Sequence, residues 1–173
     1  MRRFVPRAFQ AAVLLLTTAC ATGGGAGVSL GGDTGGRYLV MVPPLEGPNG
    51  EQVADELRAL ITAMPTHAAI RHRDVRARMA EYDLEELDEI SARQLAGLIN
   101  AQLVSWGTIR PTAGGFEADV KFVDARSGDE ITFEGISGAT PTELASNIFS
   151  RFERSVEGMR QAIFCTDYLA SQS

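Results

Sequence analysis

Hydrophobic spacing divides the chain into segments of helical and of extended character. Apolar residues recur every three or four positions in the first kind, and alternate or run together in the second. Helices are predicted at 50–64, 71–82, 91–100 and 141 to about 170, and strands at 37–42, 67–70, 102–110, 116–122 and 130–136. The order is β-α-β-α(α)-β-β-β-α, because residues 84–90 can add a further turn. Helical crossovers followed by a meander predict an α+β (α/β-like) fold. Its mixed five-stranded sheet has helices packed on it and a long helix at the C-terminus.

Helix starts are predicted from capping residues. Asn49 with Gln52 and Ser91 with Gln94 have the spacing of a capping box, in which each side chain binds a backbone N–H of the first turn. Residues 140–143 read Thr-Pro-Thr-Glu, which combines a cap, a proline at the first helical position and an acid at the third. These patterns place the starts of three helices.

The same spacing predicts which side chains face the core. Phe116, Ala118, Val120 and Phe122 should share one face of a strand, and Ile131 and Phe133 one face of the next. Leu84, Leu87 and Ile90 recur every three residues and should form an apolar stripe. The other inward positions of the helices are Val53, Leu57, Leu60, Ile61, Met64, Val75, Met79, Leu95, Leu98, Ile99, Leu144, Ile148, Phe152, Val156, Met159 and Ile163.

The first nineteen residues have the layout of a secretory signal. Arg2, Arg3 and Arg7 precede an uncharged stretch, 8–19, that ends in small residues before Cys20. The sequence Leu-Thr-Thr-Ala-Cys over 16–20 resembles the bacterial lipobox. That resemblance implies acylation of Cys20, palmitate included. The alternative is an ordinary secretory signal that is cut near the same place and gives Cys20 no special role.

Residues 20–36 are expected to form a tether. Half of the sixteen residues from Ala21 to Gly36 are glycine, and none is aromatic. Such a stretch cannot bury enough apolar surface to order itself, and its root-mean-square span is on the order of 20 Å. Ala21 takes the position where an aspartate would retain a lipoprotein at the inner membrane. By that resemblance the protein is expected in the cell envelope, at the outer membrane and facing the periplasm.

Length and charge limit the possible functions. The 173 residues, 45% of them hydrophobic, suffice for one domain, expected at 37–160. Residues 161–173 should continue the last helix, either to its true end or toward a missing segment. Loss of the leader leaves 13 basic against 22 acidic residues. This balance argues against a nucleic-acid partner, which needs a basic face.

Two stretches carry a family resemblance. The helix and strand over 92–109 and the hairpin over 120–130, with Asp124 and Gly128, resemble the small α/β domain of the TolB N-terminus and of CsgG, FlgO and LpoB-type envelope lipoproteins. We expect Gly107 to allow close backbone approach or a bulge, and Gly128 to take a positive φ. The resemblance brings no catalytic residues. It implies scaffolds, activators or secretion-channel parts that work through protein contacts.

Candidate catalytic chemistry is sparse. Residues 27–31 fit the Gly-x-Ser-x-Gly pattern, but they lie in the tether rather than in a strand-to-helix turn. Cys165 falls late in a helix, where a buried thiol or a disulfide partner is expected rather than a nucleophile. His67 and His72 are five apart, which is not the spacing of a helical metal pair. We therefore expect no enzyme, no cofactor and no metal.

Two charged runs lie next to each other. Residues 81–89 include six acidic side chains, which we interpret as the solvated face of a packed helix. A basic patch precedes them and is a possible surface for a partner: Arg71, Arg73, Arg76 and Arg78.

The function that the sequence favours is a non-enzymatic, lipid-anchored protein-binding scaffold or accessory subunit of the envelope. One alternative is a subunit of a CsgG-like secretion channel. The other is a hydrolase, thiol-dependent through Cys165 or of another kind.

Overall fold

The computed structural model describes residues 36–170, and the surroundings of side chains as far as residue 157. The signal, Cys20 and the tether lie outside the described residues, as does the side chain of Cys165. The elements are β1 Tyr38–Met41, α1 Gly50–Ala63, β2 His67–Ala69, α2 His72–Glu81, α3 Glu89–Leu98, β3 Leu103–Thr112, β4 Gly115–Asp124, β5 Glu130–Gly138 and α4 Pro141–Ala170. The strands form one sheet in the order β2-β1-β3-β4-β5. β1 is parallel to both its neighbours and the other pairs are antiparallel, so the predicted mixed sheet is confirmed.

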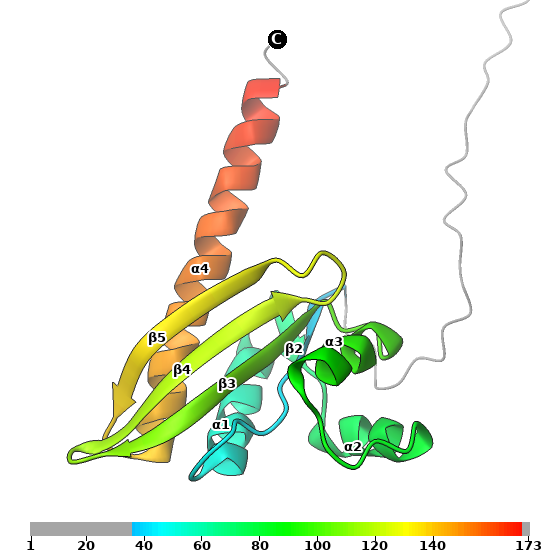
Figure 1. Ribbon diagram of the computed structural model, residues 1–173. Coiled ribbons are helices and arrows are strands. Elements are labelled where there is room, and N and C mark those ends of the chain that lie inside the picture. Colours follow the sequence, from blue (N-terminus) through cyan, green and yellow to red (C-terminus); the bar gives the residue numbers. More distant parts are fainter. Residues whose placement is uncertain (1–35, 171–173) are drawn as a thin grey trace, which may run out of the picture.

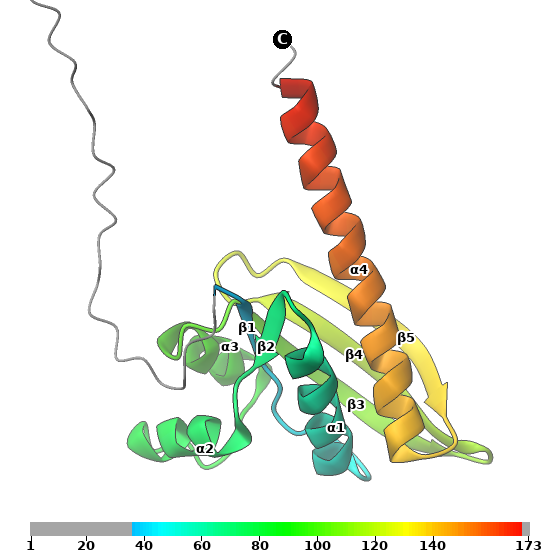
Figure 2. The same ribbon diagram turned by 180° about the vertical axis from the view of Figure 1, so that it is seen from behind.

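One face of the sheet is covered along its length by α1 and α4 (Figure 2). The apolar faces of both helices meet the inward side chains of β1, β3, β4 and β5. The short β2 adds Ala69 at the margin and His67, whose ring lies 5.4 Å from that of Phe152. At the centre, the rings of Phe122 and Phe152 lie 4.4 Å apart, and neither is exposed. This packing confirms the predicted inward faces of β4 and of α4 as far as Val156.

The opposite face is covered only in part. Val75 of α2 and Leu95 of α3 belong to a second core that packs on Met41, Val104 and Val123. These three residues belong to β1, the start of β3 and the end of β4. Figure 1 shows α2 and α3 beside the long β3–β4–β5 meander, most of which has no helix in front of it. This face of the meander is therefore largely left without a covering layer.

Two glycines meet the expectations drawn from the sequence. A Cβ atom on Gly107 would lie 2.3 Å from the carbonyl oxygen of Asp119, so β3 and β4 approach each other closely there. Gly128 has a φ of +79° in the turn between β4 and β5. Both positions exclude a side chain, for steric and for conformational reasons respectively.

The start of α4 is capped as predicted. Thr140 Oγ1 accepts a hydrogen bond from Glu143 N at 3.1 Å, and Glu143 Oε2 accepts one from Ala139 N at 3.0 Å. Both figures show α4 continuing well past the sheet. No helix within residues 36–170, α4 included, is long and apolar enough to cross a membrane.

The outer edge of β5 is modified at two points. Asn147 of α4 donates its side-chain N–H to the carbonyl oxygen of Ser137 at 2.8 Å. Next to this contact, the ladder shifts register between Ala118 and Val120, and Gly135 takes a φ of +63°. The edge strand is thus bent and partly occupied rather than straight and open.

A buried arginine connects α1 to the residue that follows β1. Arg58 is 7% exposed and donates to the carbonyl oxygen of Val42. Its guanidinium also pairs with Asp55 and Glu51, both on α1. The cation is therefore neutralised at its solvent side while its inner N–H satisfies the carbonyl directly after β1.

Three local predictions are wrong. Asn49 precedes α1 but has a φ of 59° and makes no side-chain cap, because the turn that begins at Gly47 sets its backbone. The cap of α3 is Asp88, and Ser91 is its partner inside the helix. Leu98 is 55% exposed, because the buried stripe of α3 runs instead through Ala92, Leu95, Ala96 and Ile99.

Candidate functional site

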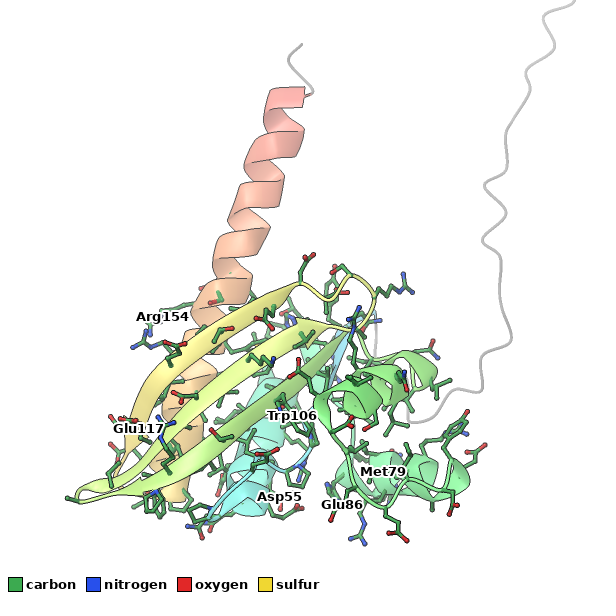
Figure 3. All side chains as sticks on the ribbon, viewed as in Figure 1. Asp55, Met79, Glu86, Trp106, Glu117 and Arg154 are labelled. Carbon is green, nitrogen blue, oxygen red and sulfur yellow. The ribbon has the colours of Figure 1, made fainter. Side chains whose placement is uncertain are left out.

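The uncovered part of the sheet, together with the adjacent side of α3, contains two hollows. The larger, which we call the α3 groove, has a volume of about 440 Å³ and is lined by Glu89, Ile90, Arg93, Gln94, Gly97, Val123, Ala125, Gly128 and Glu130. The smaller, which we call the strand hollow, has about 200 Å³ and is lined by Trp106, Gly107, Thr108, Asp119, Val120, Lys121, Thr132 and Glu134. Figure 3 shows Trp106 and Glu117 on this uncovered face.

Lys121, the only lysine of the chain, connects the two hollows. Its Nζ lies 2.7 Å from Glu89 Oε1 of α3 and 3.4 Å from Glu130 Oε2 of β5. The hydrogen bond with Glu89, more than the charge of either acid, raises the pKa of Lys121. Two carboxylates therefore share one ammonium group, and the closer contact is with α3.

A second ion cluster lies farther along the same face. Arg110 donates to Asp119 Oδ2 at 2.7 Å and to Glu117 Oε1 at 2.8 Å. The hydrogen bond with Glu117 is the main cause that raises the pKa of Arg110. Asp119 also accepts the backbone N–H of Gly135 at 2.8 Å, and this bond, followed by the one from Arg110, lowers its pKa. The cluster links all three strands of the meander.

α3 is held against the β4–β5 turn by Arg93. Its guanidinium donates to the carbonyl oxygens of Ala125, at 3.3 Å, and of Arg126, at 3.2 Å. The same guanidinium would meet any Cβ atom at Gly128, at 2.8 Å. One end of the α3 groove is therefore formed by the Arg93 side chain, which packs on Gly128 of the β4–β5 turn.

The outward side of α3 presents apolar groups to solvent. Ile90 is 70% exposed and Leu98 is 55% exposed. Each lies four residues, about one helical turn, from Gln94. Gly97 lies between them with open space around it. Large apolar residues exposed next to a hollow are typical of a surface that contacts another molecule.

The predicted basic patch lies on α2, where acids neutralise most of it. Arg71 and Arg73 both pair with Asp74, at 2.7 and 3.4 Å, and Arg78 pairs with Glu81. Arg76 is exposed on the same helix. Of the predicted acidic run, Glu81 ends α2, Asp88 caps α3 and Glu89 pairs with Lys121, so the run joins two helices instead of forming one helical face.

The two histidines lie in different surroundings. His67 is buried, with its ring 5.5 Å from Tyr38 and 5.4 Å from Phe152, and its Nδ1 lies 2.8 Å from Thr66 Oγ1. His72 opens α2, with its Nδ1 3.7 Å from Glu51 Oε1. The structure gives His67 a packing role and places His72 beside the acids of α1.

The α3 groove was not predicted from the sequence. Its signals were present: the polar residues that alternate with the inward side chains of β4, and a glycine within a helix. The pattern does not show that the Ile90 side chain faces solvent, because the three-residue spacing places this residue on a buried stripe. That direction is set by the start of α3 at Glu89 and its packing across β3 and β4.

Comparisons with known proteins give a likeness of fold. No protein-family model and no curated protein matches the sequence significantly. The structure of TolB from Acinetobacter baumannii matches over 70% of this chain and 28% of that chain, with a TM-score of 0.52 and 13% identity. The chain thus spans little more than a quarter of the TolB chain.

Two other solved structures are also similar. The LpoB C-terminal domain from Escherichia coli matches over 60% of this chain and 84% of its own, with a TM-score of 0.49 and 13% identity. Lipoprotein GNA1162 from Neisseria meningitidis matches over 70% and 96%, with a TM-score of 0.45 and 15% identity. The resemblance to TolB that was inferred from the sequence is confirmed as a shared fold.

Proposed function

We propose that this protein is a lipid-anchored component of the cell envelope that acts by binding another protein. The observation that carries the proposal is the uncovered part of the sheet, where two hollows lie beside exposed apolar side chains of α3. A layer that packs on one part of a sheet face and leaves the rest open gives a rigid, preformed surface. Such a surface is suited to recognition.

The charges on this face support binding rather than catalysis. The pKa values of Lys121 and Arg110 are raised and that of Asp119 is lowered, in each case by a hydrogen-bonded partner of opposite charge. All three groups therefore stay ionised near neutral pH. A general acid or base works best with a pKa near the working pH, so these groups are suited to fix geometry and not to transfer protons.

The anchoring part of the proposal rests on the sequence. Residues 1–19 would be removed as a signal, Cys20 would carry the acyl chains, and 20–36 would tether the domain at 37–160 to the outer membrane on its periplasmic side. More than one acyl chain is needed for stable attachment to a bilayer. We therefore expect Cys20→Ser to lose palmitate labelling and to leave the membrane fraction. Palmitate labelling that persists in this variant would contradict the anchor.

Photocrosslinking in intact cells tests the binding part. A benzoyl-phenylalanine placed at Ile90, at Gln94 or at Trp106 should give an adduct with an envelope protein, and one placed at the exposed Glu153 of α4 serves as the comparison. Cys165→Ala should leave the adduct unchanged, whereas a thiol enzyme would lose its activity. The proposal fails if correctly localised protein gives no adduct at any surface position.

A further inference from the structure

We propose that the α3 groove binds a basic segment of the partner protein that carries a large apolar side chain. This inference rests on the proposed function and specifies its recognition site. The apolar group would lie against Ile90 and the floor of the groove, and a cationic group would reach the acids of β5. Three features support this assignment: the shape of the groove, its charge and two carboxylates of β5 that can accept a cation.

The shape provides an apolar position next to a polar rim. Val123 and Ala125 lie at the base of the groove, and Ile90 stands at its edge with most of its surface in solvent. Gly97 removes a side chain from the α3 side, which leaves the wall open to an incoming group. Burial of Ile90 by a partner would remove an exposed apolar surface from water, which is the main favourable term in association.

The charge favours a basic partner. The α3 groove is lined by Glu89 and Glu130 against Arg93, and the strand hollow by Asp119 and Glu134 against Lys121. Each hollow therefore has two acidic side chains to one basic side chain. Outside the lining, Arg126 lies at the turn end, and Arg110 pairs with Asp119 and with Glu117. A surface with an acidic excess attracts cationic segments and repels acidic ones, anionic lipid headgroups included.

Two carboxylates on β5 can accept the partner's cation. Lys121 Nζ lies 2.7 Å from Glu89 Oε1 and 3.4 Å from Glu130 Oε2. The contact with Glu130 is therefore the weaker one, and a cation of the partner can replace it more easily. Glu134 lies in the strand hollow and forms no ion pair within the described part of the chain. An arginine can bind a carboxylate through two parallel hydrogen bonds, which suits it to this position better than lysine.

Selection of peptides tests the chemistry without knowledge of the partner. The acylated full-length protein, held in detergent, is used to select from a phage library of random 12-residue peptides. Enriched peptides are expected to contain arginine or lysine together with a large apolar residue, and to be depleted in acids. A set of enriched peptides with no basic excess would overturn the inference.

Paired variants then locate the binding site. Ile90→Ser should weaken the best peptide by roughly tenfold or more, as truncation of a buried anchor does, whereas the control Tyr82→Ser changes another exposed apolar residue, outside the groove, and should have no effect. Glu130→Gln should weaken binding and reduce its dependence on salt, and Glu153→Gln on α4 should do neither. Unchanged affinity in Ile90→Ser, with folding verified by circular dichroism, overturns the assignment to the groove.

The two levels of the proposal fail in different ways. If cellular crosslinks form at Trp106 or Glu153 but not at Ile90 or Gln94, the protein binds a partner at another surface and only the groove assignment is wrong. If no position gives an adduct, the proposed function is wrong as well. Adducts at Ile90 that disappear in Glu130→Gln would support both.

Discussion

Two glycine-to-alanine substitutions should change stability in opposite directions. In Gly107→Ala, the new methyl group would lie 2.3 Å from the Asp119 carbonyl oxygen and 2.9 Å from the Val120 Cα, where ordinary contact begins at 3.4 Å. Both obstacles are backbone atoms, so relief requires β3 and β4 to separate in the middle of their ladder. Overpacking costs about 1–3 kcal/mol, and one weakened ladder hydrogen bond adds about 1 kcal/mol. We expect a loss of about 2–4 kcal/mol.

Gly97→Ala is the matched control. No atom lies within 4 Å of a Cβ built on Gly97, which belongs to α3. Alanine loses less backbone entropy in a helix than glycine does, by about 0.5–1 kcal/mol. Because Gly97 is next to the last residue of α3, we expect a gain near the lower end of that range.

Urea unfolding measures both effects. The single tryptophan, Trp106, reports on the sheet, and circular dichroism at 222 nm reports on the helices, so coincident transitions would verify two-state behaviour. With a slope of about 2 kcal/mol per molar urea, the middle of the usual range, Gly107→Ala should lower the midpoint by roughly 1–2 M. An unchanged midpoint in Gly107→Ala would refute the close approach of the two strands. A loss of stability in Gly97→Ala would refute the open space around α3.

Three further substitutions test the core and its charges. Phe152→Ala should cost about 3–5 kcal/mol in the same assay, because its ring is fully buried against Phe122, and a cost below about 1 kcal/mol would contradict that packing. Arg58→Met should cost about 1–3 kcal/mol by leaving the Val42 carbonyl without its donor, and no loss would show that this bond is unimportant. Asp119 has a lowered pKa, so its contribution is present above the unfolded-state pKa near 4 and is lost as pH falls further. In Asp119→Asn, the free energy of unfolding should therefore fall less steeply as the pH drops below about 4. An unchanged pH dependence would contradict the lowered pKa of Asp119.

The order of elements followed from the sequence because it depends on local periodicity. The strict alternation of residues 116–122 can bury one face only as a strand, and the spacing from Leu144 to Val156 can bury one stripe only as a helix. The Thr140 cap was also predictable, since the cap and the acid that pairs with it lie within one turn. These features need no knowledge of distant parts of the chain.

The errors and the missed groove have a common cause in longer-range structure. Asn49 has the residue type of a cap, but the turn from Gly47 gives it a left-handed backbone that points its side chain away. Ile90 has the spacing of a core residue, yet α3 packs on the sheet through a stripe that excludes it. The hollows beside Lys121 exist because a helix crosses one part of the sheet and stops, which no local pattern encodes.

The bent and partly occupied edge of β5 has a consequence for many copies held side by side. Molecules anchored to one bilayer meet far more often than the same number dissolved in a compartment, and in fewer orientations. A straight, unprotected strand would then join to its neighbour and lengthen into a fibre. Asn147 on the Ser137 carbonyl and the kink at Gly135 remove that template from this end of β5. If the domain is anchored as proposed, neighbouring copies can therefore lie side by side without pairing through this end of β5.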